Sequence, residues 1–231
     1  MSDRSDEREL MDSGKVTAEE LSEALDFLSA SNTFLGGWAV MRERLEVWCP
    51  AWDKRRIITM LDVGTGAADL PLRILNWGRQ RRFKISIVGI DSDPAVLELA
   101  RRRTEEEPHL TLVQSDLASF AAEGGRFDYV LGSLFLHHVP PAELVGALRQ
   151  CDGLAEKGLL FSDLRRCAVA YAGVRALTCL RGRVTRNDGP LSVRRSFLPE
   201  ELEAAADAAG LRYVKVRRGP FFRLSLAGEK R

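Results

Sequence analysis

Hydrophobic and polar positions along the chain predict a helical start followed by alternating strands and helices. Apolar residues recur at helical spacing over about 18–30, after a capping box formed by Thr17 and Glu20, and again over 33–48. From residue 56 onward, short apolar runs alternate with helical patterns. This alternation is typical of parallel strands joined by helical crossovers. We predict strands at 57–63, 83–90, 110–114, 127–131 and 158–162.

The end of the chain has a different pattern. The last two predicted strands lie on either side of Gly219-Pro220, which indicates an antiparallel hairpin. Before them, residues 163–197 form a long connection in which Asn187-Asp188-Gly189-Pro190 indicates a turn. The pattern as a whole predicts an α/β fold, a doubly wound seven-stranded and mostly parallel sheet whose last strand is antiparallel.

Composition narrows the function classes only a little. The 34 basic and 33 acidic side chains of the 231 residues nearly cancel, so net charge does not indicate nucleic acid as a partner. The four cysteines form no C-x-x-C pair and lie far from the histidines, so the sequence predicts no metal site. Residues 1–15 are charged and polar, and we expect disorder there, no signal peptide and a cytoplasmic protein.

A glycine-rich turn follows the first predicted strand. Gly64-Thr65-Gly66 leads into a predicted helix from Ala67, an arrangement that presents backbone N–H groups at the carboxyl edge of a sheet. Asp69 occupies the position of the third glycine of a dinucleotide fingerprint, and no Gly-Lys-Ser/Thr follows. A ligand without phosphates fits better: Asp62 faces an ammonium group and the loop amides face a carboxylate.

Four segments in order carry a family resemblance: LDVGTGAADL, VGIDSDPAVLELA, LVQSDL and FDYVLGSLFLHHV. Over roughly residues 57–163 the chain resembles the class I S-adenosyl-L-methionine (SAM) dependent methyltransferases. The resemblance implies a Rossmann-like sheet and SAM as the cofactor. It also implies an N-terminal helical cap over 1–50, a SAM-binding domain over 51–231, and a substrate cover formed by the 163–197 insertion.

The same resemblance places the cofactor contacts. Asp91, with Ser92 beside it, follows the second strand, where a carboxylate accepts both ribose hydroxyls; the alternative is that Asp91 caps the helix that begins at Pro94. Asp116 is expected to receive the adenine amino group while apolar neighbours such as Leu117 cover the ring, although it too can be a helix cap. The residues expected at the methionine end of SAM are Ser133 and Leu134.

His137 and His138 follow the fourth strand, beside the expected sulfonium. An imidazole with a pKa near 6.5 suits removal of a proton from a phenol or enol acceptor. Adjacent residues in an extended chain point in opposite directions, so we expect one ring to face the pocket. Alternatively, both histidines hold the loop by hydrogen bonds.

Two further regions bear on the substrate. Trp38 lies in the apolar stripe of the N-terminal helices, either in a lid over the site or as a plain packing residue. The 163–197 connection is rich in arginines, and three interpretations remain open: a solvated helix face, recognition of an acidic acceptor by Arg194 or Arg195, and peripheral contact with anionic membrane or RNA.

The predicted activity is methyl transfer from SAM to an oxygen or carbon atom of a small, aromatic, polyketide-like or quinone-like molecule. This acceptor class comes from the family resemblance, especially the LHHV segment. One alternative is an RNA or protein methyltransferase. Such enzymes usually carry an Asn/Asp-Pro-Pro-Tyr/Phe signature after the fourth strand, where this chain has Ser133-Leu134-Phe135-Leu136. The other alternative is a SAM-binding protein without activity. The sequence identifies neither the acceptor nor the oligomeric state.

Overall fold

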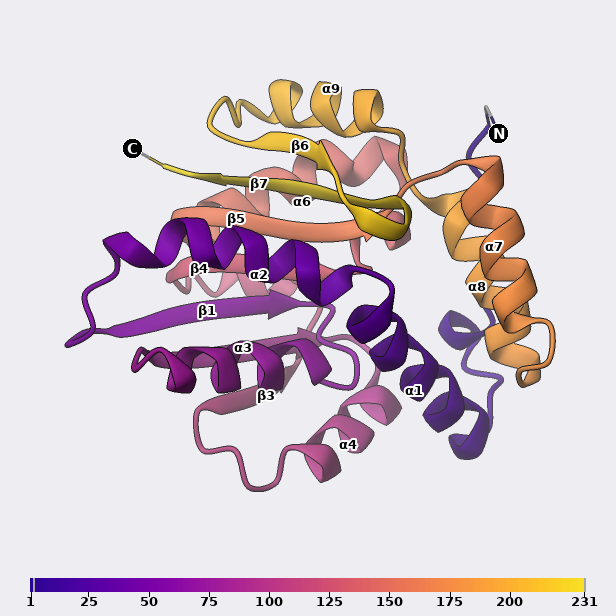
Figure 1. The fold of residues 1–231 in the computed structure, drawn as a ribbon, viewed down its shortest axis with the longest axis horizontal. Coiled ribbons are helices and arrows are strands. Elements are labelled where there is room, and N and C mark those ends of the chain that lie inside the picture. Colours follow the sequence, from indigo (N-terminus) through magenta and orange to yellow (C-terminus); the bar gives the residue numbers. More distant parts are fainter. Residues whose placement is uncertain (2, 231) are drawn as a thin grey trace.

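The computed structural model describes residue 1 and residues 3–230, and its centre is a seven-stranded sheet with helices on both faces (Figure 1). The strand order is β3-β2-β1-β4-β5-β7-β6, and all neighbours are parallel except β7, which runs antiparallel to β5 and β6. This confirms the predicted fold class. The strands are β1 (Ile57–Val63), β2 (Lys84–Asp91), β3 (Leu110–Gln114), β4 (Phe127–Ser133), β5 (Ala155–Leu164), β6 (Lys215–Arg218) and β7 (Arg223–Glu229).

The alternation of side chains along each strand divides the core into two layers. In β1, Ile58 and Met60 belong to the layer that contains α2 and α3, whereas Leu61 and Val63 belong to the layer that contains α5, α6 and α9. Because both faces are covered, the central strands are largely apolar. The helices are α1 (Ala18–Phe34), α2 (Gly37–Trp48), α3 (Asp69–Gln80), α4 (Pro94–Arg103), α5 (Leu117–Ala122), α6 (Pro141–Leu154), α7 (Ala168–Thr178), α8 (Arg183–Arg195) and α9 (Pro199–Ala209).

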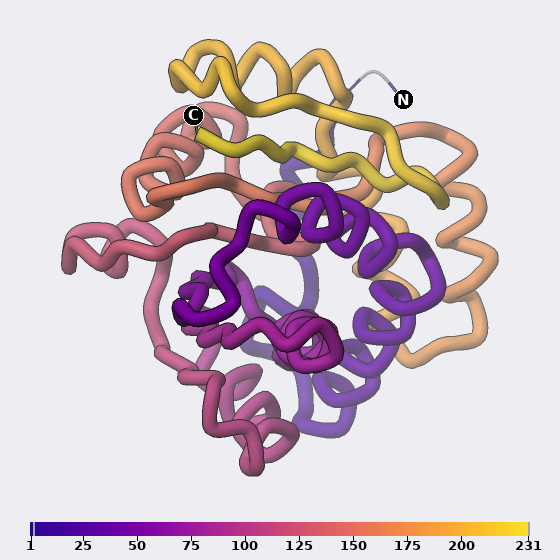
Figure 2. Tube along the Cα trace, turned by 60° about the vertical axis from the view of Figure 1, so that its left-hand side comes forward, coloured from indigo at the N-terminus to yellow at the C-terminus, as the bar shows by residue number. Residues whose placement is uncertain are grey.

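The N-terminal helices follow the predicted pattern. The Thr17 side chain accepts a hydrogen bond from the Glu20 amide, and the Glu20 carboxylate accepts one from the Thr17 amide, so the capping box is confirmed. Gly36 separates α1 from α2 with a φ of 82°. In both views α7 and α8 lie together at one end of the sheet, and α8 contacts α1 there (Figure 1, Figure 2). None of the described helices has the length and apolar character of a membrane span.

The turn predicted at Asn187-Asp188-Gly189-Pro190 is wrong, because these residues lie inside α8. Packing against α7 explains the difference. A Cβ atom on Gly189 would lie 3.0 Å from Thr178 Cγ2 and 3.1 Å from Val174 Cγ1, so the glycine allows the two helices to approach closely. Tertiary contacts here outweigh the local turn preference.

The disorder expected for residues 1–15 is also wrong for the described part of that segment, which packs against α8. The Ser5 amide donates to the Arg194 carbonyl at 3.1 Å, and the Leu10 and Met11 amides donate to the Asp188 carboxylate at 2.8 and 2.9 Å. The Asp188 side chain and the Arg194 carbonyl of α8 thus satisfy backbone donors that would otherwise need water. The segment, which ends in a short 3-10 turn, η1 (Met11–Ser13), is therefore an ordered wall beside the sheet edge.

Candidate functional site

A cavity of about 840 Å³ lies at the carboxyl ends of β1, β2 and β4, where open α/β sheets bind ligands. Its walls include the glycine loop after β1, the start of α4, the inner side of α1 and the N-terminal turn η1. All ten residues predicted to bind the cofactor line this one cavity: Asp62, Gly64, Thr65, Gly66, Asp91, Ser92, Asp116, Leu117, Ser133 and Leu134. The structure thus brings together residues from four separate loops.

The glycine loop has the backbone conformation that only glycine adopts without strain. Gly64 has a φ of 67° and Gly66 a φ of 55°, and a Cβ atom on Gly64 would lie 2.9 Å from Phe135 Cδ2. The Thr65 amide donates to the Ile90 carbonyl at 2.9 Å, and the Gly66 amide donates to the Asp91 carboxylate at 3.0 Å. Those two amides therefore hold the loop on β2, and the structure does not support their predicted contact with a ligand carboxylate.

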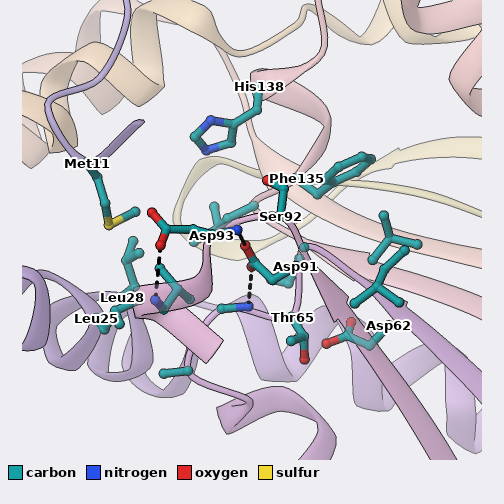
Figure 3. Close-up of a pocket in the computed structure, with 18 of the residues that line it drawn as sticks. Met11, Leu25, Leu28, Asp62, Thr65, Asp91, Ser92, Asp93, Phe135 and His138 are labelled. Atoms are coloured by element: carbon teal, nitrogen blue, oxygen red, sulfur yellow. Dashed lines mark hydrogen bonds between the residues drawn. The ribbon is translucent and has the colours of Figure 1, made fainter. Parts of the chain in front are cut away.

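Asp62 is a buried carboxylate at the base of the cavity (Figure 3). Its Oδ1 atom has no hydrogen-bond partner among the described residues. Burial, together with the nearby Asp69 and Asp91 carboxylates, raises the pKa of Asp62 to about 7 against an opposing effect of Thr65. A cationic ligand group would supply both the missing hydrogen bond and the missing charge.

Asp91 is free of the capping role considered from the sequence. Asp93 caps α4 instead, because its carboxylate accepts from the Ala95 amide at 2.7 Å and the Val96 amide at 3.3 Å. The Asp91 oxygens accept from the Gly66 and Asp93 amides, while burial raises the pKa of the Asp91 carboxyl. Figure 3 shows Asp91, Ser92 and Asp93 along one wall of the cavity.

Asp116, in contrast, does cap a helix. Its carboxylate accepts from the Ser119 amide at 2.9 Å and the Ser119 hydroxyl at 2.8 Å, and these bonds lower the pKa of Asp116. The helix that it caps, α5, has no counterpart among the elements predicted from the sequence. Asp116 and Leu117 nevertheless line the cavity, so the cap and a ligand contact are compatible.

Asn32 of α1 is a cavity residue that the sequence interpretation missed. Its side chain is 5% exposed, accepts from Ser133 Oγ at 3.2 Å and donates to Asp69 at 3.3 Å. These bonds link α1 to β4 and to the start of α3. The sequence interpretation placed Asn32 between the two predicted helical segments, whereas α1 continues through it to Phe34; a buried asparagine within a helix is costly unless its side chain has partners.

The two histidines lie side by side. They belong to the 3-10 turn η3 (Leu136–His138), not to an extended segment, and their ring centroids are 4.3 Å apart. The extended chain assumed for these residues is therefore wrong, but the expectation that one ring faces the pocket agrees with the structure. The His138 ring faces the cavity (Figure 3). His137 is 2% exposed and does not line it.

The buried His137 pairs with a carboxylate of β5. Its Nδ1 atom lies 2.7 Å from Asp163 Oδ1, and its amide donates to Asp163 Oδ2 at 3.0 Å. Burial alone would raise the pKa of Asp163, but the His137 ring and the backbone donors lower it below its usual value. An ionised carboxylate only accepts, so the His137 Nδ1 atom carries the proton of this hydrogen bond.

The three residues predicted to bind substrate do not line the cavity. Arg194 pairs with Glu7 at 3.2 Å on the surface. Arg195 is 8% exposed, donates to the His138 carbonyl at 3.3 Å and lies 3.5 Å from Asp12. Trp38 packs against the core layer that contains α2 and α3. Their roles toward a substrate stay predictions.

Comparison with known proteins supports the resemblance. A family model described as a methyltransferase domain matches residues 60–158. DszA carbon methyltransferase is 17% identical with a TM-score of 0.64, over 94% of this chain and 61% of that chain. Human N-acetylserotonin methyltransferase in complex with SAM is 17% identical with a TM-score of 0.61, over 96% of this chain and 63% of that chain.

Magnesium protoporphyrin IX methyltransferase from Synechocystis PCC 6803 with bound SAH is 15% identical with a TM-score of 0.53, over 93% of this chain and 84% of that chain. The chain spans less than two thirds of the length of DszA carbon methyltransferase and of human N-acetylserotonin methyltransferase. At these identities the three structures show a shared fold. The matched methyltransferase domain over residues 60–158 and the 3-2-1-4-5-7-6 sheet support the resemblance to the class I SAM-dependent methyltransferases.

Proposed function

We propose that this protein binds SAM in the cavity at the carboxyl edge of the sheet and transfers its methyl group to an oxygen or carbon atom of a small molecule. The observation that carries the proposal is the pair of carboxylates on the cavity wall, the buried Asp62 and the partly buried Asp91, and Asp62 has an oxygen without a hydrogen-bond partner among the described residues. SAM carries an ammonium group and a ribose diol, and no phosphate. This donor set suits it better than it suits a dinucleotide.

Each loop has a proposed role. Asp62 holds the ammonium group, and Asp91 accepts the two ribose hydroxyls because its oxygens still have lone pairs beyond those used by Gly66 and Asp93. Asp116 and Leu117 contact the adenine ring. Ser133, fixed by Asn32, lies at the methionine end together with Leu134. The methyl group of SAM is itself electrophilic. Its transfer would therefore depend on how the protein aligns the acceptor atom with it and on exclusion of water from the cavity.

The acceptor is proposed to bind on the side of the cavity formed by Met11, Leu25 and Leu28, which are apolar and pack in one cluster. This lining suits an aromatic, polyketide-like or quinone-like molecule. DszA is a carbon methyltransferase and the human neighbour acts on N-acetylserotonin, so neighbours with this fold include small-molecule enzymes. The division into a helical cap over 1–50, a SAM-binding domain over 51–231 and a cover over 163–197 belongs to the same proposal, as does a cytoplasmic location.

His138 is the proposed proton acceptor for a phenol or enol. Its ring faces the cavity, and its Nδ1 atom lies 3.2 Å from Asp12 Oδ2, which would orient the ring and stabilise the imidazolium. His137 is proposed to act indirectly, because its ring packs against the His138 ring and helps to position it. In this proposal the base is needed only when the acceptor must lose a proton.

Calorimetry tests the cofactor and a methyl-release assay tests the reaction. We expect SAM and its demethylated product SAH to bind in the micromolar range with one site per chain, and NAD to show no binding. The acceptor panel contains phenols, quinols and polyketide-like enols. Absence of SAM and SAH binding at millimolar concentration contradicts the proposal, and binding without turnover on any acceptor favours a SAM-binding protein without activity.

A further inference from the structure

Three potential metal ligands meet beside the cavity although they come from distant parts of the chain. Glu9 lies in the N-terminal segment, whereas His137 and His138 follow β4. Glu9 Oε1 is 3.7 Å from His137 Nε2, and Glu9 Oε2 is 3.9 Å from His138 Nε2. One ligand atom from each of the three residues lies within 4.8 Å of the other two. Glu9 and His137 are each 2% exposed, so this is a shielded cluster.

The outer hydrogen bonds orient both rings toward Glu9. His137 Nδ1 lies 2.7 Å from Asp163, and His138 Nδ1 lies 3.2 Å from Asp12. A carboxylate that holds Nδ1–H leaves Nε2 with a free lone pair, which is the usual arrangement of histidines that bind metals. The Ser192 hydroxyl donates to Glu9 Oε1 at 2.8 Å and so orients the carboxylate as well. All three candidate ligands therefore have an outer partner.

We propose that Glu9, His137 and His138 bind a divalent transition-metal ion, with Zn²⁺ as the best match, and that the ion fastens the N-terminal segment over the cavity. Two imidazoles and one carboxylate are a known ligand set for zinc sites with an open fourth position, and also for Fe²⁺. Ligand bonds of about 2.0–2.1 Å in a tetrahedron place neighbouring ligand atoms about 3.3 Å apart. The two Glu9–histidine distances of 3.7 and 3.9 Å would need to shorten by about half an ångström, and all three ligand atoms already lie within 4.8 Å of one another.

Charge supports this assignment independently of the distances. The salt-bridge contacts of Glu9 within the described residues are to the two histidines, whose rings carry no fixed positive charge, and a divalent cation bound by all three residues would balance the buried carboxylate. Among the described residues, no other set of three potential ligands meets in this way.

The position of the site gives the ion a structural effect. Met11 and Asp12, which follow Glu9, line the cavity, and so does His138. An ion held by Glu9 and the histidines would fix this wall against η3. While His138 Nε2 binds an ion it cannot accept a proton, so a metal-bound state and the base role of His138 exclude each other. This inference does not rest on the proposed function, since it concerns ion binding alone.

The test uses the full chain after treatment with EDTA. Titration with Co²⁺ is followed by its visible absorption bands, and Zn²⁺ affinity is obtained by competition against Co²⁺. We expect one ion per chain and micromolar or tighter Zn²⁺ binding. Glu9→Gln and His138→Ala should each weaken Zn²⁺ binding at least tenfold. Glu7→Gln and His109→Ala, which change an exposed glutamate and an exposed histidine outside the cluster, should leave it unchanged.

A second measurement tests the fastening of the segment. Zn²⁺ should raise the melting temperature of the wild-type chain and slow its trypsin cleavage near Arg8, and neither effect should occur in Glu9→Gln. Binding without fixed stoichiometry, or equal affinity in the cluster and control variants, overturns the proposal. SAM binding by the EDTA-treated chain is measured separately. SAM binding with no Zn²⁺ site leaves the proposed function intact, and a Zn²⁺ site without SAM binding contradicts only that function.

Discussion

The Asp91 carboxylate accepts a hydrogen bond from the Gly66 amide at 3.0 Å, and this bond ties the end of β2 to the loop that follows β1. The second Asp91 oxygen accepts from the Asp93 amide at 3.1 Å. The carboxylate is therefore held in place before any ligand arrives, which reduces the entropy cost of binding a diol.

Replacement of Asp91 should weaken SAM binding. We expect Asp91→Ala to lower the affinity about 10- to 100-fold, which corresponds to about 1.4–2.8 kcal/mol, because the ribose hydroxyls and the Gly66 amide both lose an acceptor. Calorimetry with SAM measures the effect. Asp53→Asn changes an exposed aspartate outside the cavity and should bind SAM like the wild type; an equal loss in both variants would speak against a ribose contact.

Asp62 should make SAM binding depend on pH. The free protein holds a proton on this group up to about pH 7, so SAM affinity should rise between pH 6 and 8 as the carboxylate ionises and can pair with the ammonium group. Asp62→Asn should bind SAM at least tenfold more weakly and should lose most of this dependence. A wild-type affinity that is constant over that range would count against an ammonium contact.

The same group should affect stability in the opposite direction. Folding raises the pKa of Asp62 from 3.8 to about 7. Between these pH values the folded state therefore holds a proton that the unfolded state has released. The contribution of Asp62 to the free energy of unfolding should fall as the pH rises from about 4 to 7. In Asp62→Asn this contribution is absent. Denaturant unfolding of both proteins in the absence of SAM, between pH 4 and 8, measures the difference in slope.

Gly64 should not tolerate a side chain. Gly64→Ala combines a φ of 67° with a Cβ atom 2.9 Å from Phe135, and we expect a loss of about 1–3 kcal/mol in the free energy of unfolding together with weaker SAM binding. Urea unfolding tests this. Gly146→Ala is the matched control, because Gly146 lies in α6 with nothing within 4 Å of the added Cβ and should gain up to about 1 kcal/mol.

Asp188 should hold the N-terminal segment in place. Asp188→Ala removes the acceptor of the Leu10 and Met11 amides, so trypsin should cleave after Arg8 and Lys15 several times faster than in the wild type. Limited proteolysis followed by mass spectrometry measures the rate. Asp207→Ala, on the exposed side of α9, should leave it unaltered, and equal rates in all three proteins would contradict an ordered segment.

Local patterns were sufficient for the sheet and for bringing the predicted cofactor-binding residues to one cavity. The strand at 57–63 and the helix at 199–209 occur with the predicted bounds, since side-chain periodicity and turn residues act over a few neighbours. The residues after β1, β2, β3 and β4 meet at one cavity because parallel strands place their carboxyl ends on the same edge.

Contacts between distant parts of the chain decided the rest. The turn signal at 187–190 lost to packing of α8 on α7, and the charged N-terminal segment is ordered because Asp188 and Arg194 accept its amide protons. Glu9 meets the two histidines only in the folded chain. The residues next to Glu9 in the sequence do not indicate its contact with the histidines. Whether a polar side chain is buried and paired depends on which distant part of the chain covers it.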